Sequence, residues 1–177
     1  PARPYDWSID GRLLIYGTGG LEILSVPILG DRKPELFLES EFTKNNAQLS
    51  PDARWLAYQS NESGRNDVYV QSFPNASDKT RVSPAGGTSP RWRSDGKELF
   101  YVGSDRKLMS VLIRTSPTKL DLSSPTPLFE IQPQSSFPVR QPYDVARDGQ
   151  RFLVTIPAES ADTPITVVVN WAAGVKK

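Results

Sequence analysis

Residues 92–101 read Trp92-Arg-Ser-Asp95-Gly96-Lys-Glu-Leu99-Phe-Tyr101, and the same pattern occurs at three other places in the chain. Each copy has an apolar residue, an Asp three positions later, usually a Gly, and then a largely apolar stretch. The other copies are Trp7-Ser-Ile-Asp10-Gly11-Arg-Leu-Leu14-Ile-Tyr16, Leu49-Ser-Pro-Asp52-Ala53-Arg-Trp-Leu56-Ala-Tyr58 and Val145-Ala-Arg-Asp148-Gly149-Gln-Arg-Phe152-Leu-Val154. The four aspartates are 42, 43 and 53 residues apart. A repeat of this length, with Asp-Gly turns between strand patterns, is typical of a β-propeller.

The residues on either side of each Asp-Gly pair have the pattern of two β-strands. Before the first pair apolar and polar residues alternate, and after it residues 13–16 are continuously apolar, which indicates a half-buried strand followed by a fully buried one. Gly accepts a positive φ and Asp can bond nearby amides, so each pair is expected to close a tight hairpin. The expected turn caps are Asp10, Asp52, Asp95 and Asp148. Ala53 replaces Gly in the second copy, so that turn must either avoid a positive φ or carry strain.

Two further strands are expected in each repeat. Third strands are predicted at 21–26, 67–73, 108–113 and 165–171, and shorter, more polar fourth strands at 35–38, 79–82 and 127–131. Four strands that grade from buried to polar make one propeller blade. We therefore predict an all-β fold, a single propeller domain over residues 1–177 with repeats at about 3–40, 46–83, 89–131 and 141–171. The last blade is expected to lack its outer strand.

The third repeat contains an insertion rich in proline and serine. It covers residues 115–127 and 132–142, on either side of the fourth strand of that repeat. We interpret these segments as a pair of long surface loops, and a binding loop on one rim is the alternative.

Composition excludes several classes of partner. The 177 residues suffice for one domain with a real core. With 21 basic and 20 acidic residues the net charge is +1, which predicts no attraction to nucleic acid or to an anionic membrane surface. No apolar run is long enough to span a membrane, so no membrane insertion is expected. The chain starts at Pro1 without a methionine, from which we expect it to be a fragment of a longer protein or a processed product.

The chain has no cysteine and no histidine. Disulfides, thiolate chemistry, the usual general base and the commonest zinc ligand are therefore missing, and a Ser-His-Asp triad cannot be formed. No Gly-x-Ser-x-Gly motif is present either. We predict from this that the chain is not itself an enzyme, with no catalytic residues, no cofactor and no metal. The repeat aspartates do not suggest calcium, because the fold places one in each blade.

Four positions offer candidate ligand-binding groups. They lie four residues before each repeat aspartate and are Asp6, Gln48, Arg91 and Asp144. Because they alternate with apolar residues, they should form a partial ring of polar groups near the propeller axis. They could bind a ligand there or only make hydrogen bonds and ion pairs between blades. Arg91 could serve either role through bidentate contacts.

Residues 48–58, with Asp67-Val-Tyr-Val70 after them, closely resemble the repeat of TolB-like, WD-type propellers. The segment Ile165-Thr-Val-Val-Val-Asn-Trp171 with Lys176-Lys177 resembles the carboxyl terminus of large bacterial serine/threonine kinases in which such a propeller follows the kinase domain. The resemblance implies a six-bladed propeller, and a four-bladed ring is the alternative. No kinase motif is present, so kinase catalysis would lie outside these residues.

The resemblance implies a protein-, peptide- or ligand-binding module, non-catalytic in itself, that senses a signal for a bacterial kinase. The alternatives are an accessory propeller of a prolyl-oligopeptidase-like hydrolase and a TolB-like scaffold of the cell envelope. The sequence assigns no compartment, although the resemblance fits a periplasmic or other extracytoplasmic site. An open arc of blades would expose an apolar sheet face at each end, so we also predict self-association, as a two-fold dimer.

Overall fold

The computed structural model of the chain describes residues 1–115, 120–131, 141–155 and 166–169, and these residues form strands and no helix. The strands are β1 (Ala2–Trp7), β2 (Leu13–Thr18), β3 (Glu22–Pro27), β4 (Glu35–Glu39), β5 (Lys44–Leu49), β6 (Trp55–Ser60), β7 (Asp67–Ser72), β8 (Lys79–Arg81), β9 (Gly87–Trp92), β10 (Glu98–Gly103), β11 (Lys107–Thr115), β12 (Leu120–Leu122), β13 (Thr126–Glu130), β14 (Tyr143–Val145), β15 (Arg151–Val154) and β16 (Thr166–Val169).

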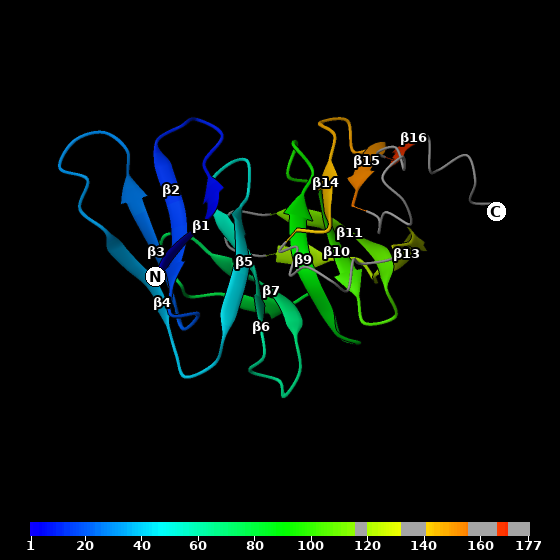
Figure 1. The fold of residues 1–177 in the computed structure, drawn as a ribbon, viewed down its shortest axis with the longest axis horizontal. Coiled ribbons are helices and arrows are strands. Elements are labelled where there is room, and N and C mark those ends of the chain that lie inside the picture. Colours follow the sequence, from blue (N-terminus) through cyan, green and yellow to red (C-terminus); the bar gives the residue numbers. More distant parts are fainter. Residues whose placement is uncertain (116–119, 132–140, 156–165, 170–177) are drawn as a thin grey trace, which may run out of the picture.

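The strands form four antiparallel sheets that follow one another in chain order (Figure 1). The first sheet is β1 to β4, the second β5 to β8, the third β9 to β13 and the fourth β14 to β16. The first strands of the sheets lie beside one another, since β1 contacts β5, β5 contacts β9 and β9 contacts β14. This arrangement of antiparallel sheets around their first strands, two of them four-stranded, is that of propeller blades, and the predicted fold class is confirmed.

The same hairpin joins the first two strands of every sheet. In each copy the backbone N–H two residues before the aspartate donates to a carbonyl five residues further on, as from Ser50 to Trp55 at 2.7 Å and from Arg93 to Glu98 at 2.9 Å. The turn residue after the aspartate has a positive φ of 71° in Gly11 and Gly96. Ala53 has a positive φ of 56°, so its turn keeps the geometry of the glycine turns and accepts the steric strain.

The four repeat aspartates occupy equivalent places in these hairpins. Oδ1 of each accepts a hydrogen bond from the backbone N–H two residues later. The donors are Arg12 (3.1 Å), Arg54 (3.2 Å), Lys97 (3.0 Å) and Gln150 (2.9 Å). Among the described residues, no group of three or more acidic side chains is placed to hold a metal ion.

The core consists of three buried clusters, one at each joint between neighbouring sheets. Leu56 and Tyr58 pack with Ile15 and Ile23 at the first joint. Leu99 and Tyr101 pack with Ala57 and Val68 at the second, and Phe152 and Val154 pack with Phe100 and Val102 at the third. In the second, third and fourth sheets, the residues four and six positions after the repeat aspartate are therefore what one sheet presents to the sheet before it.

Two features of the outer strands differ from expectation or fall outside the described residues. Leu120–Leu122 forms the short strand β12, which pairs with the end of β11, so the expected loop over 115–127 was wrong at this place. β13 pairs with the other end of β11, and the two strands share one edge of the third sheet. The fourth sheet has three strands among the described residues. The prediction that this blade lacks an outer strand concerns the residues after β16, which lie outside the described residues.

Candidate functional site

All four sheets contribute side chains to one pocket of about 160 Å³, which we call the central pocket. Its lining follows the repeat. Three positions before the aspartates stand the wall residues Trp7, Leu49, Trp92 and Val145, and one position before them stand the rim residues Ile9, Pro51, Ser94 and Arg147. Ser50 and two of the predicted ligand residues, Asp6 and Gln48, complete the lining. The pocket thus lies where the first hairpins of the blades converge.

The rim of the central pocket combines three kinds of side chain. Ile9 is 74% exposed, which leaves a large aliphatic group in solvent at the mouth. Ser94 Oγ donates to the carbonyl of Arg147 at 2.6 Å and links the third hairpin to the fourth. Pro51 lies against Gly96, where an added Cβ would be 3.6 Å from its Cδ. The rim therefore offers apolar, hydroxyl and cationic groups within one short arc.

Asp6 supplies the carboxyl group of the central pocket. Its Oδ2 accepts a hydrogen bond from the backbone N–H of Leu49 at 2.8 Å, across the first joint. Burial raises the pKa of the Asp6 carboxyl above its ordinary value, and the N–H groups of Leu49 and Trp7 and the charge of Arg91 offset this in part. A partly desolvated carboxyl group in a pocket is the kind of group that functional sites contain.

Gln48 repeats the arrangement of Asp6 one joint further along. Its Oε1 accepts from the backbone N–H of Trp92 at 2.6 Å, and Trp92 Nε1 donates to the carbonyl of Gln48 at 3.2 Å. Asp6 and Gln48 therefore connect neighbouring blades and line the pocket at the same time.

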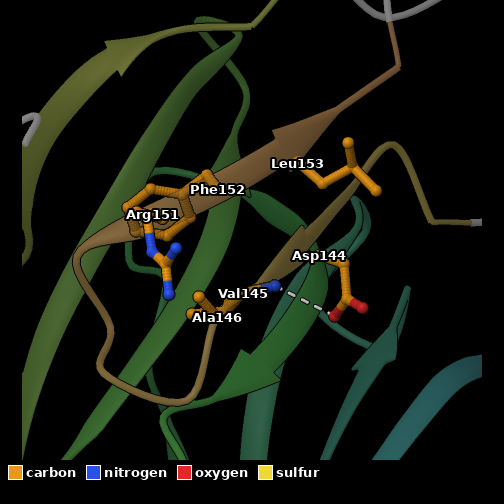
Figure 2. A pocket seen from close by; sticks show the side chains of 6 residues that line it. All are labelled: Asp144, Val145, Ala146, Arg151, Phe152 and Leu153. Atoms are coloured by element: carbon orange, nitrogen blue, oxygen red, sulfur yellow. Dashed lines mark hydrogen bonds between the residues drawn. The ribbon is translucent and has the colours of Figure 1, made fainter. Parts of the chain in front are cut away.

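Arg91 and Asp144 do not line the central pocket. Arg91 Nε lies 3.8 Å from Asp144 Oδ1, an ion pair at the third joint that is too long for a hydrogen bond, and this buried nitrogen has no hydrogen-bond partner. Asp144, with its side chain 72% exposed, accepts from the N–H of Val145 at 2.9 Å. It lies at a separate lateral pocket of about 300 Å³ on the fourth sheet, beside Leu153 (Figure 2).

The four rim residues were not among the ligand-binding residues predicted from the sequence. They immediately precede the repeat aspartates, and they differ in every copy, being Ile9, Pro51, Ser94 and Arg147. A position that varies inside an otherwise regular repeat has no common packing role, and that variation was the available signal.

Comparison with known proteins shows the fold and not a family. No protein-family model and no curated protein match the chain. TolB from Acinetobacter baumannii has a TM-score of 0.69 at 13% identity, over 96% of this chain and 41% of that one. The periplasmic gluconolactonase PpgL of Pseudomonas aeruginosa has a TM-score of 0.56 at 16% identity, over 84% and 48%. The Cps50 (Swd1) β-propeller domain of Myceliophteria thermophila has a TM-score of 0.51 at 10% identity, over 84% and 64%.

The chain thus has the fold of TolB-like propellers and spans less than half of the TolB structure. At these identities the likeness concerns the fold alone, and the kinase part of the resemblance has no support in it. The described part of the chain also contains no helix that is long and apolar enough to cross a membrane.

The prediction that the chain is not an enzyme was wrong, and these similarities overturn it. PpgL is named a gluconolactonase, so a propeller of this fold is found in an enzyme. Lack of histidine and cysteine does not exclude catalysis, because a carboxyl group such as that of Asp6 can also act as a general acid or base.

Proposed function

We propose that the chain is a propeller module that binds a protein, peptide or small ligand in its central pocket. The observation that supports this most directly is that four blades supply side chains to one pocket around a partly desolvated carboxyl group. We further propose the whole chain, 1–177, as one propeller domain with the four repeats given above.

The chemistry of the pocket favours an extended peptide segment. Ile9 at the rim and Trp7 in the wall are 74% and 54% exposed, so covering them with an apolar group is favourable. A carboxylate can accept about four hydrogen bonds, so Asp6 keeps acceptor capacity for a peptide N–H or a basic side chain beyond its contacts with the backbone. We therefore propose Asp6 and Gln48 as ligand-binding groups, while Arg91 and Asp144 stay predicted ligand residues outside this pocket.

The proposal can be tested by selecting random peptides displayed on phage against the purified chain. Peptides enriched on the wild type should bind Ile9→Lys at least tenfold more weakly, because the substitution places a charge at the mouth without touching the core. Leu29→Lys is the matched control, since Leu29 is 75% exposed in the loop after β3 and does not line the pocket.

Equal binding to wild type and Ile9→Lys would show that the peptides bind elsewhere and would overturn the proposal. Hydrolysis of a simple lactone by the wild type, abolished in Asp6→Asn, would replace the binding role with a catalytic one.

The wider roles remain proposals that rest on resemblance. The proposal that the chain is the sensor region of a serine/threonine kinase rests on the resemblance of the carboxyl-terminal segment, which lies largely outside the described residues. An accessory propeller of a hydrolase and a TolB-like scaffold of the cell envelope are the alternatives, and both rest on fold similarity alone.

Self-association is a further proposed property of the module. Leu36 in β4 is 54% exposed and Leu153 in β15 is 48% exposed, at the two ends of the series of sheets. Exposed leucines on sheet faces favour contact with another surface.

A further inference from the structure

The half-buried carboxyl group of Asp6 has no cation in contact with it among the described residues. It lies at the first joint, between two sheets that cover each other, and its partners there are the neutral backbone N–H groups of Leu49 and Trp7. Arg91 acts on Asp6 through its charge but forms its ion pair with Asp144, at 3.8 Å. Charges that leave water are normally paired with an opposite charge or a metal ion. The central pocket therefore contains an anionic group that a bound cation would complete.

The groups around Asp6 suit an organic cation better than a metal ion. Metal ions such as Ca²⁺ take six to eight oxygen ligands, and in the part of the chain that the structure describes no three acidic side chains converge on one point. The side-chain oxygen of Gln48, which also lines the pocket, already accepts from the N–H of Trp92 at 2.6 Å. A single carboxylate is instead a suitable acceptor for an ammonium or guanidinium group, which brings its own hydrogen-bond donors.

The wall of the central pocket suits both parts of a basic side chain. Trp7 and Trp92 belong to the wall, and tryptophan attracts cations more strongly than the other aromatic side chains do. Leu49 and Val145 supply aliphatic surface, along which the methylene stem of lysine or arginine can lie. An engineered cavity of about 150 Å³ holds one benzene molecule, so a pocket of about 160 Å³ has room for the end of one side chain.

Arg147 at the rim restricts what can stand beside this cation. Its backbone carbonyl accepts from Ser94 Oγ at 2.6 Å, which ties its hairpin to the neighbouring one. The side chain is exposed and forms no ion pair with any residue that the structure describes. A guanidinium group repels a second cation and binds a carboxylate through two parallel hydrogen bonds. The pocket thus presents one charge of each sign, from the first and the fourth blade.

We propose that the central pocket takes a single lysine or arginine side chain of the ligand, which pairs with Asp6, and that an acidic side chain nearby in the ligand pairs with Arg147. The inference rests on the proposed function and names the class of peptide, a segment with neighbouring side chains of opposite charge. A cation in the pocket favours the ionised form of Asp6, which burial alone disfavours, so binding offsets the effect that raises the pKa of this group.

Isothermal titration calorimetry with the peptides enriched on the wild-type chain tests the first half of the proposal. The peptides are synthesised with acetylated and amidated ends, so that only side chains carry charge. Replacing their basic residue by methionine, which keeps the apolar stem, should weaken binding by about tenfold or more, as should Asp6→Asn, which keeps an acceptor for Leu49. Asp31→Asn in the exposed loop after β3 is the control for the lost charge.

The two changes should not add. Once Asp6→Asn has removed the charge in the pocket, the methionine peptide should bind that variant about as well as the original peptide does. The change in the peptide leaves the fold of the chain untouched, so this comparison separates a lost contact from a disturbed joint.

A charge exchange tests the second half. Arg147→Glu should weaken binding of the enriched peptides, and a peptide whose acidic residue is replaced by lysine should recover most of the loss on this variant while binding the wild type poorly. Lys33→Glu, in the exposed loop after β3, makes the same change of net charge outside the pocket and should have little effect.

The contrary results are distinguishable. Peptides that lose affinity for Ile9→Lys but contain no basic residue, or that bind Asp6→Asn as tightly as the wild type, overturn the pairing with Asp6 and leave the central pocket as the binding site. Failure of the charge exchange overturns the pairing with Arg147. Peptides that bind Ile9→Lys and the wild type equally overturn the proposed function and this inference together.

Discussion

At the scale of single residues, Asp6 serves two competing purposes. It connects the first two blades through Leu49, and it presents a carboxyl group to the central pocket. Burial raises its pKa, which means that the charged form is less stable in the folded chain than in water. A group of this kind lowers stability where it is ionised, so its retention fits a role in binding better than a role in folding.

Asp6→Asn should therefore stabilise the fold at neutral pH. The amide oxygen can still accept from Leu49, and the buried charge is removed, so the free energy of unfolding should rise by on the order of 1 kcal/mol, the size of the desolvation penalty of a polar group. Because the folded pKa is raised, the penalty is absent below the ordinary value of 3.8 and complete once the pH exceeds the folded pKa. The advantage of the variant should accordingly disappear as the pH falls below 3.8.

Urea denaturation at neutral and acidic pH measures this difference. Asp31→Asn, in the exposed loop after β3, controls for the loss of one negative charge. A destabilised Asp6→Asn at neutral pH would show that the charge itself holds the first joint together.

At the scale of elements, the hairpins were predictable and the pocket was not. Asp-Gly spacing located the turns because Gly and Asp have local backbone preferences that act regardless of the surroundings. The strand β12 was missed because Leu120–Leu122 stands among prolines and serines, and only pairing with β11 makes it a strand. Asp6 and Gln48 could be predicted because polar and apolar residues alternate along their strands. Their contacts across the joints, and the convergence of the rim residues, depend on how the blades pack, and no local pattern in one sequence carries that information.

The second hairpin contains a strained residue whose replacement should stabilise it. A left-handed conformation costs an L-residue about 1 kcal/mol or more, and Ala53 adopts one with a φ of 56°. Glycine relieves this strain but loses more backbone entropy on folding, about 0.5 to 1 kcal/mol. Ala53→Gly should thus raise the free energy of unfolding by about 0.5 kcal/mol, measured by urea denaturation.

The reciprocal exchange in the third hairpin provides the matched control. Gly96 has a φ of 71°, and an added Cβ would meet nothing closer than Pro51 at 3.6 Å. Gly96→Ala should therefore lower the free energy of unfolding by about 1 kcal/mol through backbone strain alone. Loss of stability in Ala53→Gly would mean that the Ala53 methyl contributes more by packing than its backbone loses by strain.

At the scale of the whole molecule, the blades form a one-dimensional series in which each sheet contacts its neighbours. The three core clusters each belong to one joint, and the residues of one cluster do not recur in another. Stability in such arrays is close to a sum of the intrinsic terms of the units and the nearest-neighbour terms at their interfaces. The fourth sheet therefore depends on the third joint, where Phe100 meets Phe152 edge to face with centroids 5.0 Å apart.

Phe100→Ala should loosen the fourth sheet before the rest of the molecule. Removing a fully buried phenylalanine costs about 3 to 5 kcal/mol, and here the loss falls on a single joint. In hydrogen exchange the amides of β15 should lose protection while those of β6 keep most of theirs, because sub-global opening follows the weakest interface. Ile23→Ala at the first joint is the mirror-image control, and it should expose β2 and β3 while sparing β15. If either variant lowered protection equally in all four sheets, the blades would unfold as one cooperative unit, and the joints would not be separable.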